Sequence, residues 1–184
     1  RDITLTRLDA MITGTVRDTG GAPIPGADVG AGNPNWGTGT QTDASGVYTL
    51  TVYGSTWWVW VSKDGYAGTG RNITVADGGT RGGEDFALQA LDATIRGTVR
   101  DTDHNPLSGA RVDVGTSGWG TSVYADASGN YTATVYGGVW HVRAHRDGYL
   151  SEAKDITVPD GGTVTGVDLY LSRATAWIVG TVRR

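Results

Sequence analysis

The sequence is built on repetition of one short motif, Ile-x-Gly-Thr-Val-Arg. It occurs at residues 12–17, 95–100 and 178–183, and the central glycines of successive copies lie 83 residues apart. Residues 8–90 align with residues 91–173 without a gap, and about half of the aligned positions are identical. A motif that returns at a constant spacing of this length is typical of an array of similar folding units.

Each unit shows the alternation of apolar and polar residues that marks β-strands. Tyr48, Leu50 and Val52 share one side of a segment whose other side carries Thr49 and Thr51, and turns rich in Asp and Gly separate such segments. About seven short strands fit into each unit, which is the number found in a small antiparallel sandwich. The predicted fold class is therefore all-β, with two tandem seven-stranded antiparallel β-sandwich units and an extra strand at each end.

The ends of the chain repeat single strands of these units. Residues 2–5 align with the last strand at 85–88, and residues 178–183 repeat the first strand. We expect four parts: 1–7, the last strand of a preceding unit or a donor strand; 8–90, the first repeat; 91–173, the second repeat; 174–184, the first strand of a following unit or a donor strand.

An isolated strand leaves its backbone groups unpaired and its apolar side exposed. We therefore expect the end segments to act in assembly through their apolar residues, namely Ile3, Leu5, Ile178 and Val182. Two explanations stay open: the chain is an excerpt of a longer tandem protein, or its end strands complete a sheet in the next subunit. Both predict a head-to-tail, open-ended assembly of copies or repeats.

Composition narrows the classes of partner. There is no cysteine, so seven Trp and eight Tyr must supply much of the buried area that stabilises such small units. The net charge is −4 and the Arg residues are scattered, so nucleic acid is not an expected partner. No apolar run approaches the ~18 residues of a membrane span. The chain starts at Arg1 without Met or a signal peptide, so we expect a processed piece or an excerpt.

Four motifs of the repeat resemble one known family. They lie at residues 14–18, 23–29, 43–48 and 64–66, and each returns 83 residues later. Together they are similar to the carboxypeptidase regulatory-like family over nearly the whole chain. The resemblance implies a transthyretin-like, immunoglobulin-like sandwich that serves as an accessory or spacer module of secreted and surface proteins, without catalytic residues to transfer.

Two tryptophans are predicted to face outward from one strand of the first unit. Trp58 and Trp60 are two residues apart, so they stand roughly 6.6–7 Å from each other on one face of the strand. Such a pair suits contact with a neighbouring unit or subunit, a platform on which a sugar chain stacks, or an undistinguished surface. The second unit has His141 and Arg143 at these positions, so the pair is not repeated.

The remaining candidate residues concern catalysis, metal binding and glycosylation. The first unit contains no histidine, so a Ser-His-acid arrangement cannot recur in both units, and we expect no catalytic residues. His141 and His145 are four apart on a strand, about 13 Å, which does not suit one metal ion, so we expect no metal or other cofactor. Asn72 and Asn130 each begin an Asn-x-Thr sequon and are candidate glycosylation sites.

These observations predict a non-catalytic, extracellular or cell-surface structural protein. Its tandem sandwich units would assemble head-to-tail into a fibre, stalk or surface layer, with strands shared at unit boundaries. Alternative functions are a carbohydrate-binding accessory module of a secreted enzyme, with Trp58 and Trp60 as its platform, and an adhesin spacer.

Overall fold

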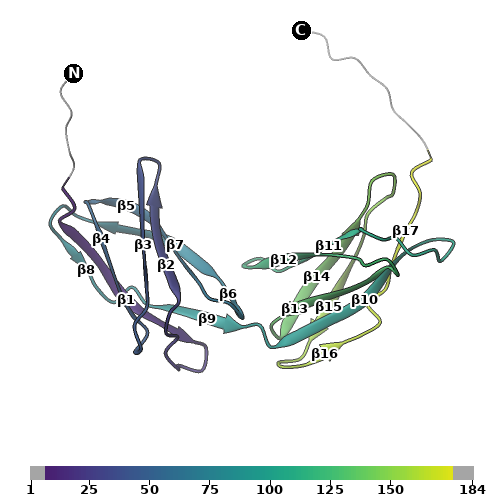
Figure 1. The fold of residues 1–184 in the computed structure, drawn as a ribbon, viewed down its shortest axis with the longest axis horizontal. Helices are drawn as coiled ribbons and strands as arrows, with labels where there is room; N and C mark the ends of the chain where they lie inside the picture. Colours follow the sequence, from purple (N-terminus) through teal and green to yellow (C-terminus); the bar gives the residue numbers. More distant parts are fainter. Residues whose placement is uncertain (1–6, 176–184) are drawn as a thin grey trace, which may run out of the picture. The chain divides into compact units, whose positions relative to one another are not determined.

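The computed structural model describes residues 7–175 and contains two all-β units, with the division between Leu91 and Asp92 (Figure 1). No helix long and apolar enough to cross a membrane occurs among residues 7–175. The last strand of the first unit ends at Ala90 and the first strand of the second begins at Ala93. Only Leu91 and Asp92 therefore connect the two units.

The first unit contains nine strands in two sheets (Figure 1). One sheet has the order β4-β1-β9-β6, with the short β8 also beside β1, and the other has the order β3-β2-β5-β7. Their bounds are β1 (Ala10–Asp18), β2 (Asp28–Asn33), β3 (Trp36–Gln41), β4 (Val47–Val52), β5 (Ser55–Ser62), β6 (Tyr66–Ala67), β7 (Thr69–Val75), β8 (Thr80–Arg81) and β9 (Phe86–Ala90).

The second unit repeats this arrangement with eight strands. One sheet has the order β13-β10-β16, with β17 also pairing with β10, and the other has the order β12-β11-β14-β15. Their bounds are β10 (Ala93–Asp101), β11 (Arg111–Gly115), β12 (Gly120–Tyr124), β13 (Asn130–Val135), β14 (Gly138–His145), β15 (Glu152–Val158), β16 (Thr163–Val164) and β17 (Leu169–Leu171).

Each unit has its own apolar core between its two sheets. Trp57 in the first unit and Trp140 in the second have no exposed surface, and each anchors a separate cluster of buried residues. A buried Trp removes about 150–250 Å² from water, so these side chains supply several kcal/mol of gross stabilisation at about 25 cal/mol/Å². The indole Nε1 groups are satisfied, because they donate to the carbonyl oxygens of Tyr53 and Tyr136 at 3.0 and 2.8 Å.

A second tryptophan contacts the buried one in each unit. The ring of Trp36 meets that of Trp57 edge-on at 5.7 Å between centroids, and Trp119 meets Trp140 in the same way at 5.8 Å. A tyrosine, Tyr53 or Tyr136, completes each aromatic group. This perpendicular arrangement is one that aromatic quadrupoles favour.

The first and last strands of each unit run side by side in the same direction. In the first unit β1 pairs in parallel with β8 near its start and with β9 near its end, and β10 pairs in the same way with β16 and β17. The carbonyl of residue 84 crosses β1 at Gly14, where a Cβ atom would overlap the oxygen; Gly97 and Val167 repeat the contact. Only glycine permits so close an approach of two backbone segments.

The predicted all-β class and tandem sandwich organisation are confirmed, with two differences in detail. The short strands β6, β8 and β16 raise the strand count above seven per unit, and the pairing between first and last strands is parallel rather than antiparallel. Alternation of apolar and polar residues reports which side of a strand is buried, but it does not report the direction of the neighbouring strand. The two extra end strands lie outside the described residues.

The close crossing at Gly14 predicts that even the smallest side chain is destabilising there. We expect Gly14→Ala to lower the free energy of unfolding of the first unit by about 1–3 kcal/mol, because the added Cβ pushes the carbonyl of Glu84 away from β1. Urea denaturation of the full chain measures the change. Gly37→Ala is the matched control, since its Cβ would lie 3.4 Å from the nearest atom, the carbonyl oxygen of Ala31. Equal stability losses in the two variants would contradict the steric explanation.

Candidate functional site

The outer face of the β3-β2-β5-β7 sheet carries the two tryptophans singled out in the sequence. Trp58 and Trp60 point outward from β5 and are 50% and 41% exposed, whereas Trp57, Val59 and Val61 between and beside them are buried. Strand alternation therefore places both indoles on one face, as predicted. We name this surface, with Trp58, Trp60 and the glycines beneath them, the tryptophan face.

Both indole rings lie over glycines of the neighbouring strands. The six-membered ring of Trp60 covers Gly30 of β2 and extends towards Gly32, and the ring of Trp58 covers Gly70 of β7. A Cβ at Gly30 would overlap the Trp60 ring. The absence of side chains there lets the ring rest on the backbone. One side of each indole is thus supported by the sheet and the other side is open to solvent.

Glycines also form the floor beside Trp60. In the register of β2 with β3, Gly30 lies opposite Gly39 and Gly32 lies opposite Gly37. A groove passes over Gly30 and Gly39, and Trp60 is among its lining residues. The Trp60 ring covers Gly30, so the open part of this floor lies at Gly37 and Gly39, where a flat ligand could approach the backbone beside the indole.

Polar groups border the tryptophan face at both ends. Beyond Trp60, Nε2 of Gln41 donates to Oδ1 of Asp28 at 2.8 Å. Beyond Trp58, the hydroxyls of Thr56 and Thr74 are 2.7 Å apart. The rim therefore consists of amide, hydroxyl and carboxylate groups.

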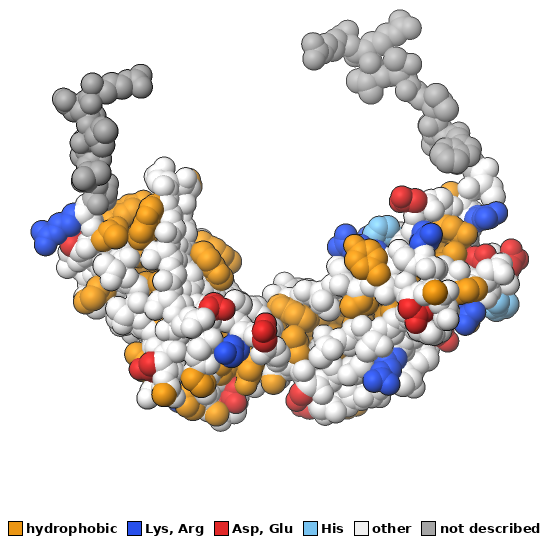
Figure 2. All heavy atoms as spheres, in the orientation of Figure 1, with side chains coloured by type: hydrophobic (Ala, Val, Ile, Leu, Met, Phe, Trp, Pro, Cys, Tyr) orange, Lys and Arg blue, Asp and Glu red, His pale blue; other side chains and the backbone are white. Residues whose placement is uncertain are grey.

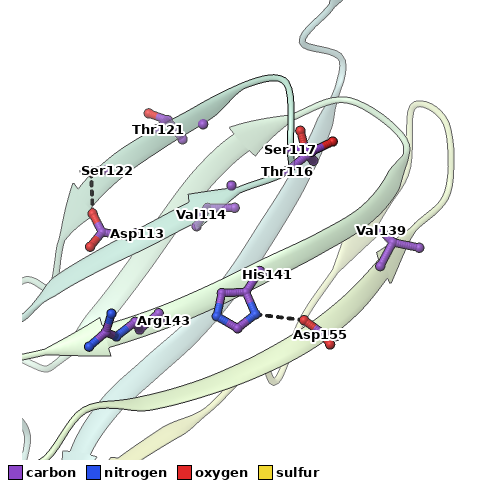
Figure 3. A pocket seen from close by; sticks show the side chains of 12 residues that line it. Asp113, Val114, Thr116, Ser117, Thr121, Ser122, Val139, His141, Arg143 and Asp155 are labelled. Carbon is purple, nitrogen blue, oxygen red and sulfur yellow. Dashed lines mark hydrogen bonds and ion pairs between the residues drawn. The ribbon is translucent and has the colours of Figure 1, made fainter.

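The same face of the second unit is polar and charged (Figure 3). His141 and Arg143 replace the tryptophans, and Asp113 and Ser122 occupy the positions of Gly30 and Gly39. These side chains line an open groove over β11, β12 and β14. The tryptophan pair is therefore not repeated in the second unit, which has His141 and Arg143 at these positions.

Hydrogen bonds order the charged groups of this groove. Oδ1 of Asp113 accepts from Nε of Arg111 at 2.7 Å and from the hydroxyl of Ser122 at 2.5 Å. Nδ1 of His141 lies 2.8 Å from Oδ1 of Asp155, and both side chains are largely exposed (Figure 3). Such exposed pairs contribute little to stability. On the face drawn in Figure 2, acidic and basic side chains are scattered among each other rather than gathered into one charged field.

The other sequence candidates lie apart from the tryptophan face or at its edge. Asn72 is exposed on β7 directly opposite Trp58. Asn130 lies at the start of β13, where its side-chain amide donates to Asp126 at 3.3 Å and its backbone N–H donates to the same carboxylate at 2.9 Å. The backbone N–H of Asn130 is the main cause that lowers the pKa of Asp126.

No cluster of three potential metal-ligating side chains occurs among residues 7–175.

The assembly candidates Ile3, Leu5, Ile178 and Val182 lie outside the described residues. Within residues 7–175, β1 and β10 contain the copies of the motif found at residues 178–183. The strands β9 and β17 correspond to residues 2–5 in the repeat. The structure therefore describes how strands of these two kinds pair inside a unit.

Sequence reasoning missed one polar contact that recurs in both units. Oδ1 of Asp85 accepts from the backbone N–H of Thr15 at 2.7 Å and from its hydroxyl at 3.0 Å. In the second unit, Oδ1 of Asp168 accepts from both groups of Thr98 at 2.9 Å each. Repetition of a Thr and an Asp 70 residues apart in both units was a signal that could have revealed it. The glycine floor likewise left a signal, since glycines alternate at residues 30, 32, 37 and 39.

Comparison with solved structures finds proteins of low sequence identity. The Bacillus anthracis TIE protein is 15% identical with a TM-score of 0.42, over 89% of this chain and 34% of that one. A streptococcal ancillary pilin is 13% identical with a TM-score of 0.48, over 92% and 63%. The shaft pilin SpaA from Lactobacillus rhamnosus GG is 12% identical with a TM-score of 0.36, over 92% and 98%. The chain thus spans about a third of the first of these proteins and under two thirds of the second.

A comparison with curated proteins finds no match. The model of the carboxypeptidase regulatory-like domain, in contrast, matches twice, at residues 11–89 and 94–172. The two matches follow the two structural units and together cover most of the chain. The motifs that carry the resemblance lie inside the matches; the first-strand motif at 14–18 lies in the first match and its copy at 97–101 in the second. This chain belongs to the carboxypeptidase regulatory-like family, of which it contains two domains in tandem.

Proposed function

We propose that this chain is a non-catalytic structural segment of an extracellular or cell-surface protein, in which sandwich units are joined in series. The observation that carries this proposal is the parallel pairing of the first and last strands in each unit. When two paired strands run in the same direction, the start of one and the end of the other lie at opposite ends of the pair. Each unit therefore receives the chain at one end and releases it at the other.

This geometry suits a spacer, stalk or fibre. A unit whose ends lie far apart adds its own length to the array, and the two residues between β9 and β10 leave little slack between successive units. Family membership supports the same role, since accessory and spacer modules are what the resemblance implies. A spacer that holds an adhesin domain away from a surface would use the same geometry.

We further propose that the end segments pair between neighbouring copies in the register seen inside a unit. Arg17 lies opposite Ala87 in the pairing of β1 with β9. Arg183 stands two periods after Arg17, and Thr4 stands one period before Ala87. Arg183 of one copy would then lie opposite Thr4 of the next, with Ile3, Leu5, Ile178 and Val182 on the apolar side. A head-to-tail contact of this kind does not close on itself, so it would build filaments.

Cysteine pairs test this register, because the chain contains no cysteine of its own. Strands paired in register bring Cα atoms close enough for a disulfide. We expect the double variant Thr4→Cys/Arg183→Cys to give a ladder of covalent multimers on a non-reducing gel after mild oxidation. Electron microscopy of the same preparation is expected to show filaments.

Two matched variants control the crosslinking. Arg17→Cys/Ala87→Cys uses the observed pair within a unit and is expected to form an intramolecular disulfide. Thr4→Cys/Thr181→Cys moves one partner two residues along the strand and is expected to crosslink poorly. If the observed pair crosslinks while Thr4→Cys/Arg183→Cys stays monomeric, the proposed register between copies is wrong.

A second candidate function is binding of neutral carbohydrate on the tryptophan face. Two indoles lie against the sheet with their outer sides exposed, 50% and 41%, beside a groove with a glycine floor. A pyranose ring presents flat C–H faces that can stack on an indole, while its hydroxyls need amide and hydroxyl partners such as Gln41, Thr56 and Thr74. The second unit lacks these aromatic surfaces.

The carbohydrate hypothesis predicts that binding depends on both indoles. A glycan array would identify the best neutral oligosaccharide, and calorimetry with that oligosaccharide should show roughly a tenfold loss of affinity for Trp58→Ala and for Trp60→Ala, about the 1–1.5 kcal/mol of one aromatic contact. Tyr124→Ala removes an exposed aromatic side chain from the second unit, 67% exposed, and should leave binding unchanged. Binding that survives loss of both tryptophans, or an array without any bound glycan, would exclude this function.

A further inference from the structure

We propose that the pairing of first and last strands in each unit is a mechanical clamp that resists force applied along the chain. This inference rests on the proposed function, because only units joined in series carry such a force. Each clamp nevertheless lies within one unit, so it can be tested separately from assembly.

The direction of the paired strands decides how the clamp is loaded. Tension enters the first unit at the start of β1 and leaves it at the end of β9, and these strands run parallel. The two strands are therefore pulled past each other along their own axes. Hydrogen bonds between strands lie across these axes. All bonds of the clamp resist together, whereas strands pulled apart from one end would lose their bonds one at a time.

Contacts extend along most of β1. Met11 and Ile12 lie opposite Thr80 and Arg81, and residues 16–18 lie opposite residues 86–88. Between these stretches, three residues of β1 face four residues of the partner segment, so the partner contains a bulge. The second unit has the same register, with residues 94–95 opposite 163–164 and residues 99–101 opposite 169–171.

The bulge would interrupt the clamp, but the side chain of Asp85 and one backbone hydrogen bond connect the two strands there. The carboxylate of Asp85 accepts from the backbone N–H and hydroxyl of Thr15, so it takes the place of a backbone carbonyl in the ladder. A charged acceptor makes these bonds stronger than neutral ones. The backbone N–H of Glu84 also donates to the carbonyl of Thr13 at 3.0 Å.

A tyrosine from the core fixes the bulge from the other side. The hydroxyl of Tyr48 donates to the carbonyl oxygen of Glu84 at 2.7 Å, and Tyr131 does the same to Val167 at 2.7 Å. Burial raises the pKa of both tyrosines, so their hydroxyls remain protonated donors. The glycine crossing described above brings this carbonyl close to β1. Two units with many differing surface residues thus keep the same set of bonds at the bulge.

The first unit adds an ionic tie to this bulge. The carboxylate of Glu84 lies 2.8 Å from Nη2 of Arg71 and 2.7 Å from Nε of Arg81. The hydrogen bond from Arg71 is the largest cause that lowers the pKa of Glu84, and Arg81 adds to it. The second unit has Val167 at the position of Glu84. The Thr–Asp pair, and not this ion pair, is therefore the part common to both clamps.

Single-molecule stretching of the full chain between terminal handles tests the clamp. We expect two force peaks, each followed by a gain of roughly 25 nm, which is the extended length of about 80 residues at ~3.5 Å each less the roughly 3 nm that the folded unit already spans. Asp85→Ala should lower the force of one peak and leave the other unchanged. Asp85→Asn keeps an acceptor oxygen for the Thr15 amide and should retain most of the force. Asp168→Ala should have the same effect on the other peak.

A matched variant separates mechanical strength from stability. Asp43 accepts two backbone N–H bonds, from Ser45 and Val47 at 2.8 and 2.9 Å, in a turn between β3 and β4. This turn accepts one bond from β1, from the N–H of Val16 to the carbonyl of Gly46 at 2.7 Å, but it takes no part in the pairing of β1 with β8 and β9. Asp43→Ala should lower the urea midpoint without a comparable fall in rupture force. If Asp43→Ala and Asp85→Ala weaken the peak equally per unit of lost stability, the clamp is excluded. That outcome would leave the crosslinking of the end segments unaffected, so the two proposals can fail independently.

Discussion

The whole architecture depends on one close approach of two backbone segments. The carbonyl of residue 84 crosses β1 at Gly14, and from this crossing follow the tyrosine bond, the bulge and the Thr15–Asp85 contact. A side chain at the glycine would push the carbonyl of residue 84 away from β1 and weaken the contact between first and last strands. The motif Ile-x-Gly-Thr-Val-Arg contains the residues that this crossing requires. Its Ile and Val lie in the core, its Gly lies at the close contact, and its Thr bonds to Asp85.

Sequence reasoning predicted the parts of the fold that depend on alternation along a single strand. The positions Tyr48, Leu50 and Val52 are buried on one side of their strand as expected, because the side of a strand follows from parity alone. Strand direction was not predicted in the same way. The parallel partner of β1 lies about 70 residues away in the sequence. The only sequence signal of this pairing is the repeated Thr and Asp, at Thr15 and Asp85 and again at Thr98 and Asp168. Bulges also escape such reasoning, because an extra residue shifts parity only locally.

The candidate sites illustrate the same division. Parity predicted that Trp58 and Trp60 share an exposed face, but it could not predict that their rings would rest over Gly30 and Gly70, since this depends on which strands are neighbours. The two units share most of their inward residues, whereas on the outer face of β5 and β14 His141 and Arg143 replace the indoles. Packing constrains the inner faces in both units alike. The outer faces are free of that constraint, and any binding specificity is expected to reside there.

The two-residue junction between β9 and β10 has a consequence for misfolding. The last strand of the first unit must find β1, yet the next strand synthesised, β10, carries nearly the same motif and would suit the same place. Neighbouring domains of similar sequence are prone to exchange strands in this way. A parallel pairing, however, needs a crossover of a dozen or more residues between the strands, and Leu91 and Asp92 are far too short for one. The junction therefore prevents β10 from replacing β1 beside β9 and keeps each unit closed by its own strand.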